Sequence, residues 1–289
     1  MTDVGSLTVQ CVYGADDVAH LTSSLIPSLA AATALRVQLH TINYDPSSPI
    51  RLESGEYHNV VVRDIQNLSD HPSGFAENHN QLFREFKPCP YFVIINPDCI
   101  ATPGCFDTLI ARKMNSAGGV AIVESRQWPF EHPKEYDEAT LETPWASGAC
   151  SLIDSEFFTK VGGFAQEYFL YTEDVDLSWR AWIAGYRVLY EPDSVVIHFS
   201  DGPHRKPGEV TPEVLFSISN DIALTYKFFG DAAAEKAIQT YRTREASELV
   251  EVAAQRYRTE VKPLISFEAP AMLPSQIKVI EPGRYHEFR

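Results

Sequence analysis

Short strand-like runs alternate with helical patterns through the first hundred residues, and this alternation limits the folds that the chain can adopt. The strand-like runs cover 7–13, 35–43, 59–62 and 91–95. Helical patterns lie between them at 16–32 and 74–86, the second with Asn78 and Asn80 on its exposed side. The run 91–95 is almost continuously apolar, as is typical of a strand buried on both faces. Strands separated by helices predict an α/β fold with a mixed, mostly parallel sheet flanked by helices.

The second half of the chain has a less regular pattern. Further strands are predicted at 118–124, 150–153, 187–190 and 195–198. Helices are predicted at 155–161, 173–184, 212–229 and 232–261. Loop or irregular composition marks 127–143, 200–211 and 267–289. We therefore predict an α/β domain over residues 1–210 and a helical C-terminal extension over residues 211–289.

The charge and the cysteines exclude several classes of protein. The 24 Lys and Arg against 39 Asp and Glu give a net charge of 24 − 39 = −15, which argues against a nucleic-acid partner because phosphates need a positive surface. The five cysteines have no Cys-x-x-Cys spacing, so we expect reduced thiols in the cytosol. There is no signal-peptide pattern and no apolar run of about 18 residues. We expect a cytoplasmic protein without a transmembrane segment, and peripheral attachment to the inner face of the membrane stays open.

The first candidate site follows the apolar run 91–95 directly. It consists of Asn96, Pro97 and Asp98. In parallel α/β sheets, ligands bind just beyond the carboxyl ends of the strands, and Pro97 stiffens the turn that directs Asp98. A carboxylate there suits Mg²⁺ or Mn²⁺, which can hold a diphosphate. An ordinary strand-ending turn explains the same residues.

The second candidate site is a group of three acids at the start of the predicted helix 173–184: Glu173, Asp174 and Asp176. Compensation of the helix dipole, with Thr172 as the N-cap, is one explanation. However, the acids follow the aromatic stretch 168–171 and share their helix with two tryptophans. A carboxylate beside an apolar wall can have its pKa raised toward that of a useful general base. Residue types alone leave catalysis and capping both open.

Other residues suggest how a ligand is handled. His198 ends the apolar run 195–198 and either completes a metal site with Asp98 or is a hydrogen-bonded structural histidine. Gly148, close to Trp145 and Ser147, either lets the backbone approach a ligand or marks a bulge. The glycine-rich phosphate-binding motifs are missing from the sequence. A metal would therefore have to hold any phosphate groups.

Taken in order, these segments resemble family 2 glycosyltransferases with the GT-A fold. The run 147–187 closely resembles the rhamnosyltransferase-like branch. Residues 74–80 are similar to the Gly-Phe-x-x-x-Asn-Asn stretch of that branch, and 96–98 lies where the family carries its Asp-x-Asp-type metal motif. His198 falls where the branch often has a downstream histidine. The resemblance covers roughly residues 6–200.

The resemblance implies roles for these residues. Asp98 would hold Mg²⁺ or Mn²⁺ on the donor diphosphate, with His198 as a further ligand. Asp174 would be the general base that deprotonates the acceptor hydroxyl, with Glu173 beside it, in a single displacement that inverts the anomeric centre. Donor or nucleotide binding is assigned to Tyr13, Asn43, Asn78, Asn96 and Asp98. Acceptor or sugar binding is assigned to Trp145, Ser147, Gly148 and Asp176.

The expected function is inverting transfer of a sugar, rhamnose or another hexose, from a dTDP- or UDP-sugar to a glycan or lipid-linked glycan. The C-terminal helices could pack on the domain, pair two copies of the chain or touch a membrane, and their lack of a strong basic face favours packing or pairing. The predicted second strand ends in Asn43, where the family usually has an Asp that helps to hold the nucleotide base. This difference motivates one alternative, a non-catalytic nucleotide-sugar- or glycan-binding protein. A metal-dependent nucleotidyltransferase is the other, and the absence of Lys and Arg from residues 12–16 argues against it.

Overall fold

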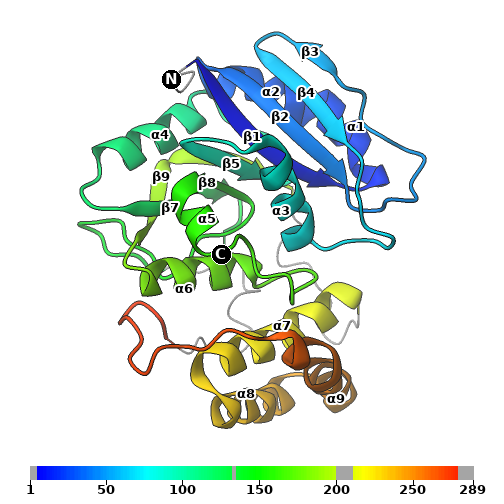
Figure 1. Ribbon diagram of the computed structural model, residues 1–289, viewed down its shortest axis with the longest axis vertical. Helices are drawn as coiled ribbons and strands as arrows, with labels where there is room; N and C mark the ends of the chain where they lie inside the picture. Colours follow the sequence, from blue (N-terminus) through cyan, green and yellow to red (C-terminus); the bar gives the residue numbers. More distant parts are fainter. Residues whose placement is uncertain (1–4, 132–134, 200–210, 279–289) are drawn as a thin grey trace.

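The computed structural model describes residues 5–131, 135–199 and 211–278, and a mixed sheet forms the centre of this part of the chain (Figure 1). Within these residues the sheet has nine strands in the order β3-β4-β2-β1-β5-β8-β7-β9-β6. The strands are β1 (Ser6–Tyr13), β2 (Arg36–Asn43), β3 (Gly55–Tyr57), β4 (Val60–Ile65), β5 (Tyr91–Ile95), β6 (Cys99–Ala101), β7 (Val120–Trp128), β8 (Cys150–Asp154) and β9 (Arg187–His198).

The pairing brings several strand ends to one edge of the sheet. Strand β1 runs parallel to β2 and β5, β2 runs parallel to β4, and β7 runs parallel to β9. Strand β8 is antiparallel to both β5 and β7, so β5 and β7 point the same way. The carboxyl ends of β1, β2, β5, β7 and β9 therefore share an edge, where α/β sheets bind ligands. The predicted mixed, mostly parallel sheet is confirmed.

Helices cover both faces of the sheet (Figure 1). A helical segment after β1 contains α1 (Val18–His20), a π-helical turn (Leu21–Leu25) and α2 (Ile26–Ala32). The π-helical turn precedes Pro27, which lies in the first turn of α2, where a missing N–H is tolerated. The other helices are α3 (Phe75–Phe86), α4 (Cys105–Asn115), α5 (Ser155–Lys160), α6 (Glu173–Ile183), α7 (Pro212–Phe229), α8 (Asp231–Arg244) and α9 (Ser247–Arg256).

Two hydrophobic cores result, one on each face. The first joins the sheet to α2 and α4 through Leu29 and Phe106. The second joins the sheet to α3, α5 and α6, and continues into α7, α8 and α9. Trp179 of α6 packs edge-on against Phe228 of α7, with ring centroids 4.9 Å apart. Helix α6 thus lies between the sheet and the C-terminal helices, as Figure 1 shows.

Several local predictions need correction. The two strands predicted at 187–190 and 195–198 are one strand, β9, whose pairing with β7 jumps from Glu191 to Val195. Pro192 lies in this bulge, where its missing N–H breaks no ladder hydrogen bond. The helix predicted at 232–261 is broken between α8 and α9. Strands β3 and β6 and helix α4 were not predicted; three-residue strands are too short to show a periodicity.

The predicted exposure of Asn78 and Asn80 is wrong, because both side chains are buried. Asn80 donates to the Phe164 carbonyl and accepts from the Phe164 N–H, both at 2.9 Å. These two hydrogen bonds satisfy the buried Asn80 amide, which the helical pattern of the sequence predicted on the exposed side of α3. A polar side chain with matching backbone partners can be buried at little cost.

Parts of the sequence-based interpretation lie outside the described residues. These are the loop predicted at 200–211, apart from Thr211, and the end of the segment 267–289, from residue 279 on. In the part that the structure describes, every helix is too short or too polar to cross a lipid bilayer.

Candidate active site

The first half of the site lies where β5 and β9 end. The turn 96–98 follows β5, and β6 pairs with β9 so that Cys99 lies opposite His198. This pairing brings Asp98 Oδ2 to 3.3 Å from His198 Nε2. Asp98, Cys99 and His198 each offer one ligand atom within 4.8 Å of the others. The sheet therefore brings together the two predicted metal ligands, which are 100 residues apart in the sequence.

The chemistry of this cluster suits a hard divalent cation. Burial alone would raise the pKa of Asp98, but the hydrogen bond and charge of His198 outweigh it and hold the pKa below its ordinary value. Burial raises the pKa of the Cys99 thiol well above its ordinary value, and soft sulfur ligands suit hard cations such as Mg²⁺ poorly. A carboxylate and an imidazole remain, a set that fits Mn²⁺ or Mg²⁺ when phosphate and water oxygens complete the coordination.

His198 has a second partner that the sequence analysis missed. Its Nδ1 lies 2.7 Å from Oε1 of Gln127, a buried residue near the end of β7. When Nδ1–H donates to this amide oxygen, loss of the Nε2 proton that faces Asp98 leaves a lone pair on Nε2, as a metal ligand must have. Gln127 pairs with Val196, two residues from His198 along β9. Only this long-range pairing identifies Gln127, because its local sequence looks like a loop.

Two residues of the segment after β1 also act on the metal half of the site. The pKa of Asp98 is lowered in part by the charge of His20, and Asp98 in turn helps to raise the pKa of Asp17, after the larger effect of burial. The sequence analysis did not single out either residue. These electrostatic effects indicate that the start of the helical segment lies close to Asp98.

The second half of the site is the start of α6. Tyr171 and Thr172 have φ angles of 73° and 71°, in the left-handed region, immediately before the helix begins at Glu173. Thr172 is the N-cap, as predicted, but its side chain makes no capping hydrogen bond. Asp174 instead accepts a hydrogen bond from the Gly148 N–H at 2.8 Å through Oδ2. This carboxylate therefore contacts a different segment, which simple capping does not require.

The other two acids of this helix have different environments. Glu173 is buried, and burial and then the charge of Asp174 raise its pKa well above its ordinary value. Its Oε2 has no hydrogen-bond partner among the residues described. Asp176 is fully buried and lies 2.5 Å from both Arg180 Nε and Lys227 Nζ. The Asp176 carboxylate thus ties α6 to α7.

A short segment before β8 connects the two halves of the site. The Gly148 N–H donates to Asp174, and the next residue, Ala149, accepts a hydrogen bond from the Asn96 N–H at 2.9 Å. A Cβ on Gly148 would lie 3.2 Å from Phe75 Cζ, so the glycine permits this close approach. The adjacent residues Gly148 and Ala149 therefore fix Asp174 and the turn that carries Asp98.

The remaining predicted acceptor residues lie next to this segment. Trp145 is almost fully buried. The buried Ser147 accepts a hydrogen bond from the Ala149 N–H at 3.2 Å. Ser147, Gly148 and Asp174 line one small cavity, which Phe164 and Leu177 also border. Acceptor binding by Trp145, Ser147 and Gly148 stays a prediction, with the three residues grouped beside Asp174.

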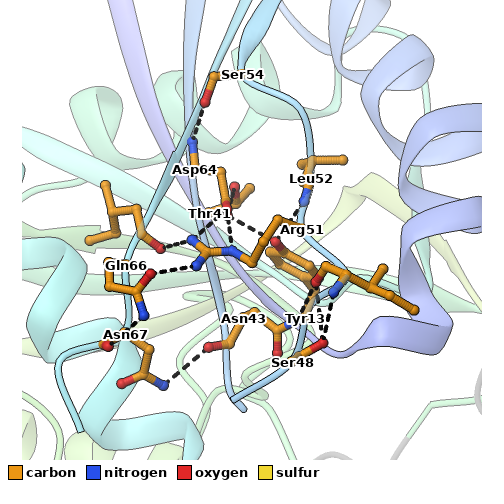
Figure 2. Close-up of polar contacts among 12 residues, drawn as sticks. Tyr13, Thr41, Asn43, Ser48, Arg51, Leu52, Ser54, Asp64, Gln66 and Asn67 are labelled. Atoms are coloured by element: carbon orange, nitrogen blue, oxygen red, sulfur yellow. Dashed lines mark hydrogen bonds and ion pairs between the residues drawn. The ribbon is translucent and has the colours of Figure 1, made fainter. Parts of the chain in front are cut away.

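The predicted nucleotide end is a closed polar network (Figure 2). The Tyr13 hydroxyl donates to Asp64 at 3.0 Å and accepts from the Leu52 N–H at 2.8 Å. Burial, as the largest cause, raises the pKa of Tyr13 to about 12. Asp64 also accepts from Thr41 and from Arg51. The network fastens the chain after β2 across the ends of β1, β2 and β4.

Asn43 and Asn78 also hold loops of the protein. The Asn43 amide donates to the Ile50 carbonyl at 3.0 Å and accepts from the Asp45 N–H at 2.9 Å. Asn78 donates to the Ser73 and Gly74 carbonyls, both at 2.9 Å, in front of α3. Direct contact of these side chains with a nucleotide stays a prediction. The structure brings Asp98 and His198 together and links Asp174 to the Asp98 turn through residues 148 and 149. Tyr13, Asn43 and Asn78 support the surrounding loops.

Comparisons with known proteins agree with this architecture. No family model matches the chain. The chain is 32% identical to the N-acetylglucosaminyl-diphospho-decaprenol L-rhamnosyltransferase of Mycobacterium tuberculosis, over 37% of this chain and 46% of that protein. It is 37% identical to the rhamnosyltransferase WbbL of Escherichia coli, over 25% of this chain and 28% of that protein. The matches therefore span less than half the length of either relative.

Solved structures show the same fold. GalNAc-T7, in a crystal structure with UDP, GalNAc and Mn2+, superposes with a TM-score of 0.56 at 12% identity, over 88% of this chain and 55% of that one. The mannosyltransferase PcManGT from Pyrobaculum calidifontis, in complex with GDP-Man and Mn2+, superposes with a TM-score of 0.54 at 14% identity, over 90% of this chain and 72% of that one. The fold is thus the GT-A fold of known glycosyltransferases. The resemblance to the rhamnosyltransferase-like branch is confirmed.

Proposed function

We propose that this protein is a metal-dependent, inverting glycosyltransferase that moves a sugar from a nucleotide-diphosphate donor to an acceptor hydroxyl. One observation carries this proposal: residues 148 and 149 hold Asp174 and the Asp98 turn at one edge of the sheet. An inverting displacement needs a base on one side of the anomeric carbon and a stabilised leaving group on the other. Asp174 and the Asp98–His198 pair supply these two functions.

The metal half of the site would hold the donor. Asp98 and His198 would bind the cation, and Gln127 would keep His198 in the required tautomer. The bound cation would neutralise the diphosphate and so stabilise it as a leaving group. The low pKa of Asp98 keeps its carboxylate charged at neutral pH and therefore ready to bind a cation.

The other half would activate the acceptor. The acceptor hydroxyl gives its proton to Asp174 while its oxygen forms the new bond to the anomeric carbon. The bond between that carbon and the donor phosphate breaks, and its electron pair leaves with the diphosphate. The Gly148 N–H fixes the orientation of Asp174, and burial, which raises the pKa of Glu173, disfavours a second charged carboxylate beside it.

The two relatives named as rhamnosyltransferases support a narrower proposal. The donor would carry rhamnose or a related hexose on dTDP or UDP, and the acceptor would be a lipid-linked glycan, as the name of the mycobacterial relative indicates for that enzyme. Such an acceptor would bring the protein to a membrane surface.

Ligand-induced stabilisation tests the metal half. dTDP and UDP should raise the melting temperature of the wild type in the presence of Mn²⁺ but not in its absence, because ligands that bind only the folded state stabilise it by mass action. Asp98→Ala should abolish the Mn²⁺-dependent increase. Asp70→Ala, at a side chain that is 96% exposed, is the control and should behave like the wild type. If neither nucleotide stabilises the wild type, the proposal fails.

The Asn43 side chain is hydrogen-bonded within the protein at the predicted nucleotide end. The alternative of a non-catalytic binding protein therefore needs its own test. A turnover assay with dTDP-rhamnose and a polyprenyl-diphosphate-linked sugar separates the two. Multiple turnovers of transfer support the enzyme, whereas binding of the donor without product supports the alternative.

A further inference from the structure

The two residues in front of α6 adopt a costly conformation. A left-handed backbone costs roughly 1–2 kcal/mol for a residue other than glycine, and Tyr171 and Thr172 both adopt it. Such residues persist where the surrounding structure holds them in place. Because Glu173 and Asp174 follow directly, whatever holds this pair also sets the position of Asp174.

Asn220 of α7 makes that contact. Its side-chain NH₂ donates to the Leu170 carbonyl at 2.7 Å and to the Tyr171 carbonyl at 3.2 Å. The Asn220 side chain is fully buried. A single amide therefore holds two successive carbonyls of the approach to α6.

Arg256 of α9 fixes the orientation of this amide. Its Nη1 donates to Asn220 Oδ1 at 3.0 Å and to Ser219 Oγ at 2.5 Å. The guanidinium lies 4.7 Å from the ring centroid of Phe216, on the preceding turn of α7. Since Asn220 Oδ1 accepts from a cation, the NH₂ group must face the carbonyls of 170 and 171.

The same segment is held from its other side by α3. The Phe75 N–H donates to the Phe169 carbonyl at 3.0 Å. A Cβ on Gly74 would lie 2.1 Å from that carbonyl oxygen, so only glycine allows the contact. The segment 169–171 is thus fixed between the start of α3 and the middle of α7.

We propose that Asn220, oriented by Arg256, is a positioning residue that holds the left-handed pair Tyr171–Thr172 and thereby keeps Asp174 against Gly148. This inference rests on the proposed function, because it assumes that Asp174 is the general base. It makes the C-terminal helices part of the machinery of transfer, although their residues need not touch the substrate. The Lys227–Asp176 ion pair is a second tie between the same two helices.

Two variants test the proposal against a matched control. Asn220→Asp keeps the size of the side chain but removes the NH₂ donor, and Asn220→Leu removes both polar groups. Tyr241→Phe is the control, because it breaks a buried 2.6 Å hydrogen bond to Asp221, the next residue of α7, on the side of α8. Hydrogen exchange of the peptide 169–177 is measured together with kcat and the donor KM.

Both Asn220 variants should speed exchange in 169–177 about tenfold relative to the control, since local opening governs exchange. They should also lower kcat about 10- to 100-fold, as expected for a misplaced catalytic group, with the donor KM unchanged. Exchange equal to that of Tyr241→Phe would overturn the proposal, as would faster exchange with an unchanged kcat. Normal turnover in Asp174→Asn would contradict the proposed function itself. If Asp174→Asn is inactive while both Asn220 variants are fully active, only the positioning role is rejected.

Discussion

The two halves of the site are positioned by different parts of the fold. Asp98 and His198 stand at strand ends, and neighbouring strands bring them to 3.3 Å. Asp174 stands at the start of a helix whose approach is held by side chains and backbone groups from 74–75, 148 and 220. The proposed metal half thus depends mainly on the sheet, and the proposed base half depends on packing between helices.

This difference has a consequence for how each half tolerates substitution. A strand end keeps its position as long as the ladder of backbone hydrogen bonds stays intact, and most side-chain changes leave that ladder alone. A helix start with a left-handed approach needs specific partners, so distant substitutions can move it. We expect substitutions in α7 to affect turnover and substitutions in β7 to affect metal affinity.

The largest effect should come from removing the base itself. Asp174→Asn should lower kcat by about 10²- to 10⁴-fold, the usual contribution of general base catalysis. Stabilisation by nucleotide and Mn²⁺ should stay at the wild-type level, because the metal half is untouched. Asp193→Asn, at an exposed position in the bulge of β9, is the control. A kcat within tenfold of the wild type in Asp174→Asn would assign the base to another residue.

A large effect on stability should follow from breaking the tie between α6 and α7. Burial would raise the pKa of Asp176, but Arg180 and Lys227 outweigh it and hold the pKa below its ordinary value. In Lys227→Met the Asp176 carboxylate loses one of two cations, and breaking a buried pair costs about 3–5 kcal/mol. Thermal or denaturant unfolding measures this loss.

The pH dependence of the same variant has a definite sign. A lowered folded-state pKa adds stability above the unfolded pKa of about 3.9, and this stability is lost as the pH falls. The difference between the wild type and Lys227→Met should therefore be large at pH 7, persist down to about pH 4 and shrink only as the pH falls further. Lys262→Met, which removes an exposed ion pair with Asp231, should change stability by less than about 1 kcal/mol. Equal losses in the two variants would contradict the assigned role of Lys227.

A moderate effect should come from the metal half. Gln127→Leu removes the acceptor for His198 Nδ1, and loss of such a supporting contact usually weakens metal binding about 10- to 100-fold. Titration of Mn²⁺ at fixed nucleotide measures the change. At saturating Mn²⁺ the kcat should approach that of the wild type, because Asp174 is unaffected. An unchanged Mn²⁺ affinity would contradict the supporting role of Gln127 in metal binding.

The smallest effect should come from Glu173→Gln. Burial and then Asp174 raise the pKa of Glu173, so the folded state keeps a proton that the unfolded state loses above about pH 4.3. The stability that Glu173 contributes is fully present below that pH and is lost as the pH rises through its raised folded-state pKa. The variant should therefore gain melting temperature relative to the wild type at pH 8 and show little difference at pH 4. The same difference at both pH values would contradict the raised pKa of the buried Glu173.

The sequence by itself determined the strands, most helices and the acids at their ends. Apolar runs and helical periodicity are local properties, so β1, β2, β5 and α6 were predicted close to their observed bounds. The position of Asp98 directly after a buried strand was enough to place it at the binding edge of the sheet. The resemblance in residues 145–198 then selected the GT-A fold and Asp174.

Only the tertiary structure decided which polar side chains lie in the candidate site and which hold the protein together. Asn78 and Asn80 are buried, and Asp176 pairs with α7, because partners far away in the sequence satisfy their hydrogen bonds and charge. Gln127 and Asn220 acquire their roles only when β7 pairs with β9 and α7 packs beside α6. Such pairings depend on which surfaces meet in the folded chain. A local sequence pattern does not contain this information.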